Sequence, residues 1–220
     1  MPLNTKSITI GGLVAAAANG IATSQSGSSI SINGSLASGG VASLSQARRV
    51  IVTSQGDDTG ITFSIVGTDG YGRAQTEVLK GTSGPSTPAQ TAHDFLTVTS
   101  ITPSGAVASS VTAGTNGTAS SDAYIVDWVP NGNLIGINAI ASGSVTYSVE
   151  ECYDDFSPAW DQANNTWNWV QDATIKSTSA SAHGQLAGPF TAIRITVNSY
   201  SGTSASVTAK LITPFIGGRI

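Results

Sequence analysis

The sequence predicts an all-β protein built as an antiparallel β-sandwich or jelly-roll-like fold. Apolar and polar residues alternate with a period of two in many short stretches, as in residues 61–69. Gly, Asp and Pro punctuate these stretches at spacings typical of tight turns. Thr, Val, Ile and Ser are abundant while Leu, Glu and Lys are scarce, which disfavours long surface helices. A chain of 220 residues can form one large β-domain or two smaller β-rich halves.

Residues 1–28 are predicted to form an extended N-terminal arm with a short strand at 7–10. The segment is rich in Gly, Ala and Ser, and such an arm alone buries too little apolar surface to offset its ordering entropy. We therefore expect it to lie on a neighbouring subunit, with Ile8, Ile10 and Leu13 as partner-binding residues. Its beginning superficially resembles a signal peptide, but the small-residue run lacks an apolar core, so no such peptide is expected.

The first β-rich half is predicted over residues 29–116. Its aspartates in GDDTG and TDGYG lack the alternate spacing of a calcium loop, and Asp beside Gly between apolar strands is what a hairpin turn requires. These turns favour a three-stranded antiparallel meander followed by a Pro-containing loop. The expected strands are 30–32, 41–44, then the meander strands 48–54, 61–69 and 73–81, and finally 95–105 and 107–114.

The second half is predicted over residues 120–216, after a small, polar linker at 114–122. The tripeptide ASG at 141–143 reads as a hairpin connection, and SYSG at 199–202 reads as a turn. The expected strands are 123–129, 134–141, 144–153, 173–181, 190–199 and 204–214.

A polar, Trp-rich loop at 154–172 interrupts this pattern and holds Trp160, Trp167 and Trp169. Exposed, these indoles would stack on sugar rings or anchor a protein partner, because Trp dominates interface hot spots. Alternatively they form a lid over the protein's own core. The sequence leaves both interpretations open, and the three residues are predicted as partner-binding.

No catalytic, cofactor-binding or metal-binding residue is predicted, and we expect a protein that is not an enzyme. Glu150 and Glu151 begin the densest acidic cluster, which continues at 154–155, but neighbours on a strand point to opposite faces. They therefore cannot face each other across a sugar as glycosidase carboxylates do. His93 and His183 lie in different halves without zinc-ligand spacing, and the lone Cys152 has acidic neighbours that disfavour a reactive thiol.

Charge and hydropathy argue against two further classes of protein. The formal net charge is −4 and charged residues are only 10 % of the chain, with no basic cluster beyond Arg48 and Arg49. Nucleic-acid binding needs a concentrated basic face, so we expect none. No stretch approaches 18 consecutive apolar residues, so we expect no membrane span.

Four stretches of the chain share a recognisable pattern. They are ARRVIVTSQGDDTGITFSIVGTDGYGRAQTEVLKG at 47–81, FLTVTSITPSG at 95–105, GSVTYSVEECYDD at 143–155 and GPFTAIRITVNSYSGTSASVTAKL at 188–211. Together, as a meander, a TVTS strand and a late TAIR-x-TVNS hairpin, they resemble a group of tailed-bacteriophage virion proteins, and the likeness covers most of residues 47–210.

The resemblance implies a non-enzymatic virion structural protein that is assembled in the host cytoplasm. The expected role is that of a capsid decoration (cement) protein, which forms a homo-oligomer, expected to be a trimer, and binds major capsid protein or other virion proteins. A tail or head–tail component is the alternative within this class. Independently of the resemblance, the Trp-rich loop and the acidic cluster leave open a carbohydrate- or receptor-binding module or a glycan hydrolase as the alternative from another class, and a secreted adhesin is a third. The family supplies no catalytic residues.

Overall fold

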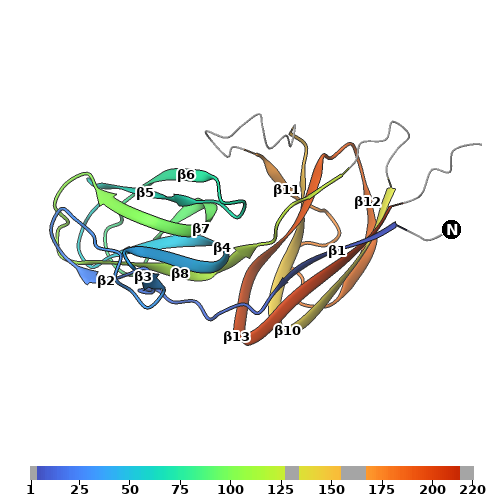
Figure 1. Ribbon diagram of the computed structural model, residues 1–220, viewed down its shortest axis with the longest axis horizontal. Helices are drawn as coiled ribbons and strands as arrows, with labels where there is room; N and C mark the ends of the chain where they lie inside the picture. Colours follow the sequence, from blue (N-terminus) through green and yellow to red (C-terminus); the bar gives the residue numbers. More distant parts are fainter. Residues whose placement is uncertain (1–3, 127–133, 155–166, 214–220) are drawn as a thin grey trace, which may run out of the picture. The chain divides into compact units, whose positions relative to one another are not determined.

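The computed structural model describes residues 4–126, 134–154 and 167–213, and every regular element in these ranges is a β-strand (Figure 1). The strand pairings are antiparallel, which confirms the predicted all-β antiparallel class. The finer assignment to a sandwich or jelly roll stays a prediction. In the described ranges no helix is long and apolar enough to cross a membrane.

The described residues divide into two compact units. Unit 2 is residues 15–119, and unit 1 combines residues 4–14 with the described residues from 120 onward. The predicted halves at 29–116 and 120–216 followed the order of the chain, whereas unit 1 also takes in the beginning of the chain.

Unit 2 is a sheet in the order β8-β4-β7-β5-β6, with β2 beside β8 and β3 beside β4. Because β7 lies between β4 and β5, the predicted meander of three successive strands is wrong in its order, although β5 and β6 do form a hairpin. The strands are β2 (Ala22–Gln25), β3 (Ala37–Ser38), β4 (Val41–Ser54), β5 (Thr62–Thr68), β6 (Ala74–Lys80), β7 (Ala89–Pro103) and β8 (Val111–Ser120).

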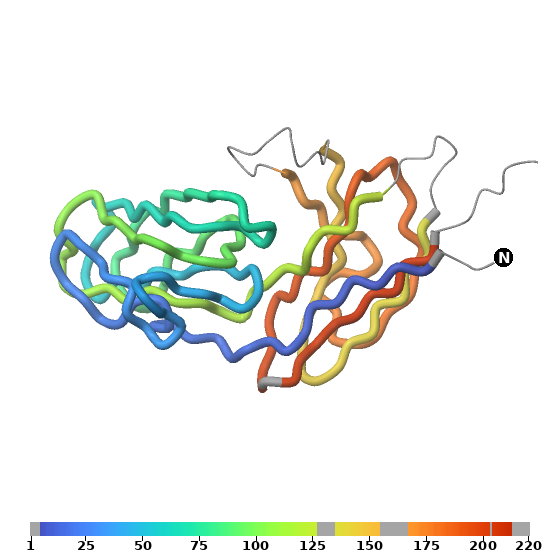
Figure 2. Tube along the Cα trace, in the orientation of Figure 1, coloured from blue at the N-terminus to red at the C-terminus, as the bar shows by residue number. Residues whose placement is uncertain are grey.

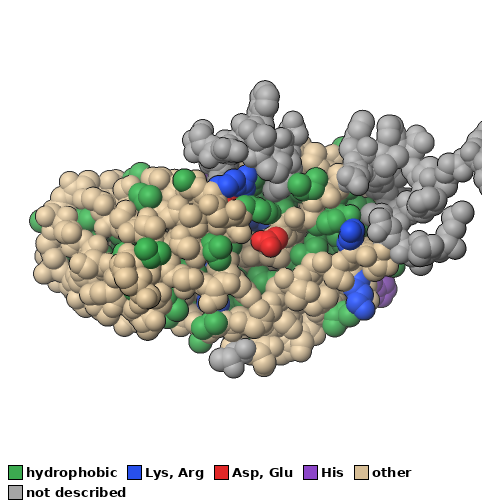
Figure 3. Space-filling view, in the orientation of Figure 1, with side chains coloured by type: hydrophobic (Ala, Val, Ile, Leu, Met, Phe, Trp, Pro, Cys, Tyr) green, Lys and Arg blue, Asp and Glu red, His purple; other side chains and the backbone are tan. Residues whose placement is uncertain are grey.

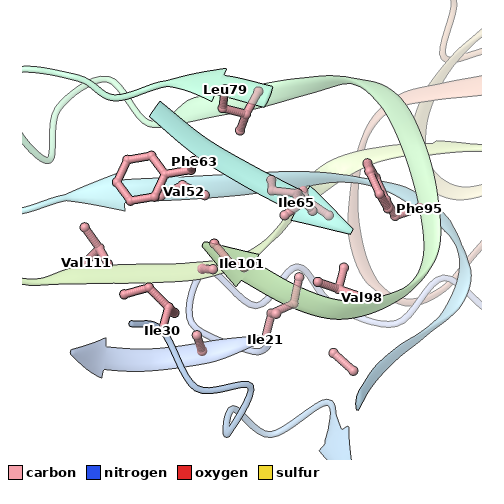
Figure 4. Close-up of a cluster of buried hydrophobic side chains, with 14 of the residues drawn as sticks. Ile21, Ile30, Val52, Phe63, Ile65, Leu79, Phe95, Val98, Ile101 and Val111 are labelled. Atoms are coloured by element: carbon pink, nitrogen blue, oxygen red, sulfur yellow. The ribbon is translucent and has the colours of Figure 1, made fainter. Parts of the chain in front are cut away.

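The core of unit 2 follows from the alternation that the sequence displays. On β5, Phe63 and Ile65 are buried while their neighbours Thr62, Ser64 and Val66 are not, as expected for a strand with one face on the core. Figure 4 shows these side chains in one buried cluster that also contains Phe95, Val98 and Ile101 of β7. The first part of β7 pairs with β4 and its last part pairs with β5, so one strand contributes to both neighbours.

Unit 1 is organised by two long strands, β10 (Leu134–Cys152) and β13 (Ala192–Thr213), which pair along most of their length. Figure 2 shows the blue N-terminal trace running beside the red trace of β13. The shorter strands of the unit flank these two: β1 (Asn4–Gly11) and β9 (Tyr124–Ile125) pair with β13, and β11 (Trp169–Gln171) and β12 (Ala182–Ala187) pair with β10.

Two predicted turns in this unit are wrong. ASG at 141–143 lies inside β10 and SYSG at 199–202 lies inside β13, where the register between the strands shifts. Pairing passes from Ser142–Ser206 to Ser144–Ser201, so the small residues form a bulged irregularity and the strands continue. The strand expected at 173–181 is not regular in the structure, and β12 was not predicted.

The N-terminal residues that were expected to form an arm are part of the chain's own sheet. Residues Asn4–Gly11 pair continuously with Thr213–Ser206 of β13. Ile8, Ile10 and Leu13 are 7 %, 2 % and 0 % exposed. Burial within the chain itself therefore explains their apolar character, and a partner-binding role for them stays a prediction.

Candidate functional site at the end of β10

The chemistry-bearing residues of unit 1 gather where β10 ends. There Glu150, Glu151 and Cys152 pair with β11 on one side and with Arg194, Ile193 and Ala192 of β13 on the other. Directly paired residues of an antiparallel ladder share a face. One face of the sheet therefore carries Glu150, Cys152 and Arg194. Glu151 lies on the opposite face, as the alternation of a strand requires.

Glu150 is held in an ion pair. Arg194 Nε donates to Glu150 Oε2 at 2.8 Å, and Thr196 Oγ1 donates to the same oxygen at 2.7 Å. Glu150 is only 8 % exposed, so the guanidinium offsets much of the desolvation cost of its carboxylate. Oε2 of this carboxylate is therefore occupied by two donors from β13.

Arg194 also contacts the Trp-rich region. Its Cζ atom lies 4.3 Å from the centre of the Trp169 ring, which is the geometry of a cation–π contact. Trp167 and Trp169 are half-buried and pack against Cys152 and Ala192. The structure thus places both indoles partly on their own core and partly in solvent, between the two interpretations that the sequence left open. Trp160 lies outside the described residues.

The opposite face carries Glu151, Tyr153 and Asp172. The Tyr153 hydroxyl donates to Glu151 Oε2 at 2.7 Å, and this bond, together with burial and the nearby negative charges, raises the pKa of Tyr153 to about 12. Burial raises the pKa of Glu151 above its ordinary value, and the negative charge of Asp172 raises it further. Asp172 accepts the backbone N–H groups of Thr174 and Ile175 at 2.9 and 2.6 Å, so it caps the turn that follows β11.

Cys152 is fully buried, and burial raises the pKa of its thiol. A buried thiol of raised pKa is a poor nucleophile. Within the described residues no group of three or more His, Cys, Asp or Glu side chains could hold a metal ion. His93 and His183 lie in units 2 and 1 respectively.

No family model matches this chain, and no curated protein matches its sequence significantly. The resemblance to tailed-phage virion proteins therefore stays a prediction.

The acidic turns of unit 2 are bonded to their own chain. Asp57 accepts from the N–H and hydroxyl of Thr59 at 3.1 and 2.7 Å, and these bonds lower the pKa of Asp57. Asp69 accepts from the N–H groups of Tyr71 and Arg73, both at 2.9 Å, and from Arg73 Nε at 2.8 Å. These are the side-chain-to-backbone bonds of Asx-type turns, as the sequence predicted.

The sequence did not predict the two side chains that bind Glu150 at the end of β10. Arg194 and Thr196 lie 44 and 46 residues from Glu150 along the chain, and no local pattern connects them. The one usable signal was the alternation of TAIRITV at 191–197, which places Arg194 and Thr196 on the same face of a strand.

Proposed function

We propose that this chain is a non-enzymatic structural protein of a tailed-phage virion, most simply a capsid decoration (cement) protein that bridges and stabilises major capsid protein subunits. The observation that carries the proposal is that carboxylates in the phage-like stretches bond to groups of their own chain. Asp57, Asp69 and Glu77 bond to their own chain, and Glu150 is paired with Arg194. In this proposal these four carboxylates serve the scaffold as acceptors.

The surface supports a bridging role. Charged side chains are sparse in the space-filling view, where most of the surface is backbone and uncharged polar side chains (Figure 3). Sparse charge suits a protein that buries much of its surface against partners, since interface cores are depleted in charged residues. In this proposal the chain assembles in the host cytoplasm as a homo-oligomer, expected to be a trimer. Repeated contacts with several shell subunits then multiply weak affinities.

Immunogold labelling of intact phage particles with an antibody against this chain tests the proposal. Label spread over the head is expected for a decoration protein. Label confined to the tail or to the head–tail junction would reject decoration and favour the tail or head–tail alternative. Complete absence of the chain from purified particles, measured by mass spectrometry, would reject a virion role.

The thermal stability of the particles provides a second test of the cement role. Particles assembled without this chain should lose DNA at lower temperature than complete particles, and adding the purified chain should restore their stability. Equal stability with and without the chain would contradict the cement role even if the chain is found on the head.

A carbohydrate- or receptor-binding module is the second candidate, because Trp167 and Trp169 keep part of their surface in solvent. Indoles of this kind stack on sugar rings. Trp167→Ala should then abolish binding in a glycan-binding assay while leaving the far-ultraviolet circular dichroism unchanged. Undiminished binding by this variant would remove the Trp-based argument.

A further inference from the structure

Two carboxyl groups, those of Glu151 and Asp172, lie close together across the short ladder of β10 and β11. Glu151 pairs with Val170, and the N–H of Asp172 donates to the carbonyl oxygen of Val149 at 2.9 Å. Glu151 and Asp172 are therefore diagonal neighbours on one face of the ladder. Their exposed fractions are only 6 % and 9 %. The ladder thus holds two acidic groups side by side with little access to water.

Within the described ranges neither carboxyl group takes part in an ion pair. The neighbouring cation of β13, Arg194, lies on the opposite face and binds Glu150. On the face of Glu151, β13 contributes Ile193 and β9 contributes Tyr124. No described cation on these strands therefore neutralises the pair.

The two carboxyl groups are held in different ways. Asp172 accepts the N–H groups of Thr174 and Ile175, so the turn after β11 fixes its position. The segment that follows adds one charged group, Lys176, whose side chain is exposed.

Glu151 is the group in which a proton makes the difference. Its hydrogen bond within the described residues comes from the Tyr153 hydroxyl at 2.7 Å. Burial raises the pKa of Glu151, the Tyr153 bond lowers it, and the charge of Asp172 raises it again, with a net rise. A neutral Glu151 still accepts the Tyr153 hydroxyl, so protonation removes the like-charge repulsion and keeps the bond.

Strand β11 is the element that responds to this repulsion. It has three residues and, in the described part of the chain, pairs with β10 alone. A short edge strand opens locally at a smaller free-energy cost than a central strand. Trp169, which contacts the guanidinium of Arg194, lies on this strand, so opening β11 would release an indole from unit 1.

We propose that Glu151 and Asp172 form a pH-sensitive latch, which holds β11 and its Trp169 on β10 more tightly in mildly acidic than in neutral or alkaline solution. The sign follows from linkage. A group whose folded-state pKa is raised contributes stability that is fully present below its unfolded value and is lost as pH rises through the folded value. The latch concerns the Trp-bearing strand and does not depend on the virion role.

Hydrogen exchange of the full chain, followed by NMR from pH 4.5 to 8 and corrected for the intrinsic exchange rate, tests the latch. The amide of Asp172, which is bonded to Val149, reports on the opening of β11. Its protection should fall by at least about twofold as pH rises, because like charges across a ladder are destabilising. Protection that stays constant or increases with pH would overturn the proposal.

Three variants separate charge from packing. Glu151→Gln stays neutral, so its protection should remain at the acid level throughout. Asp172→Asn keeps an oxygen that can accept from Thr174 and Ile175 but removes the charge, so it should lower the midpoint of the Glu151 carboxyl titration, followed by carbon-13 NMR. Tyr153→Phe removes a donor to the carboxylate, so it should raise that midpoint.

Opposite shifts in the last two variants would not arise from a merely structural disturbance. An unchanged midpoint in Asp172→Asn would overturn the proposal, and this readout stands even if Glu151→Gln does not fold. Asp57→Asn is the matched control, since Asp57 is an exposed carboxylate of unit 2. It should leave the Glu151 midpoint and the Asp172 exchange profile unchanged. An equal shift in this control would assign the effect to net charge and overturn the latch.

Discussion

Single carboxylates of this protein act as acceptors that join segments of its own chain. Glu77 of β6 is the clearest case, because it accepts the N–H groups of Ala92 and His93 at 2.5 and 3.0 Å and contacts His93 Nδ1 at 3.1 Å. Strands β6 and β7 are not paired with each other, so this carboxylate satisfies two backbone donors that no strand reaches. Residues of this kind have a structural role that is measurable as stability.

Glu77→Gln should lower the free energy of unfolding by about 1–3 kcal/mol at pH 7, because a charged acceptor is replaced by a weaker one. Burial raises the pKa of Glu77, but its bonds to His93 and Ala92 outweigh that effect and hold the pKa below its ordinary value. A lowered folded-state pKa stabilises the protein above the unfolded value, and this contribution is lost as pH falls through the folded value.

Urea unfolding at pH 7 and near pH 3 measures how the stabilisation by Glu77 depends on pH. The difference between wild type and Glu77→Gln should shrink in acid, because wild type loses the stabilisation that the variant never had. Asp122→Asn, at an exposed position, is the control and should show no such difference. A gap that stays constant from pH 7 to pH 3 would show that the charge of Glu77 is not the source of its effect.

The ion pair of Glu150 and Arg194 supports a second residue-scale prediction. Arg194→Met should destabilise the protein by at least about 2 kcal/mol, since it leaves a largely buried carboxylate with Thr196 as its remaining side-chain partner. The double variant Glu150→Gln/Arg194→Met should cost less than the sum of the single variants, with a coupling of about 1–3 kcal/mol. Tryptophan fluorescence should change in Arg194→Met because the guanidinium covers Trp169.

Lys210→Met is the matched control for this cycle, because Lys210 is an exposed cation on the same strand, β13. It should leave both stability and fluorescence close to wild type. Additive single-variant effects would mean that the pair contributes nothing beyond the separate side chains.

At the scale of elements, irregular positions decide how the strands run. The register shifts between β10 and β13, between β4 and β7, and between β5 and β7 all lie inside strands. In the β5–β7 pair the shift falls at Val66 and Gly67. Such bulges bend a strand and increase its twist, which lets long strands such as β7 pair with different neighbours along their length.

Gly67→Ala should destabilise unit 2 by at least about 2 kcal/mol, because the added Cβ would lie only 1.9 Å from the carbonyl oxygen of Thr97 and the backbone must move. Gly184→Ala, within β12, is the control: no atom lies within 4 Å of its added Cβ, so a change of no more than about 0.5 kcal/mol is expected. Thermal unfolding of both variants measures the difference, and equal melting temperatures would argue against a tight β5–β7 contact at this bulge.

At the scale of the whole molecule, the beginning and the end of the chain belong to one unit. The β1–β13 ladder joins residues about two hundred positions apart, from Asn4–Thr213 to Gly11–Ser206, while unit 2 is formed by the residues between. Contacts so distant in sequence form only after long loop closure. Unit 1 therefore depends on residues that precede unit 2 in the chain.

Deleting residues 1–14 should destabilise unit 1 and leave unit 2 intact, because the deletion removes the buried side chains of Ile8, Ile10 and Leu13. Hydrogen exchange should become faster in β10 and β13 and stay slow in β4, β5 and β7. Unchanged exchange in β13 would contradict a stable β1–β13 ladder in solution.

If the deletion variant aggregates, Ile10→Ala gives the same information. It should cost about 2–5 kcal/mol as a large-to-small change at a buried site, whereas Thr9→Ala, at the exposed neighbouring position, should cost much less.

The sequence by itself determined what depends on near neighbours in the chain. The alternation at 61–69 specified β5 and its buried Phe63 and Ile65, and the Asp–Gly turns specified the bonds of Asp57 and Asp69. The same alternation placed Glu150 and Glu151 on opposite faces. Only the tertiary structure decided that β7 lies between β4 and β5 and that β1 belongs to β13. It also decided that Gly143 lies in a bulge, because Gly and Ser suit a turn and a bulge equally and the paired strand selects between them.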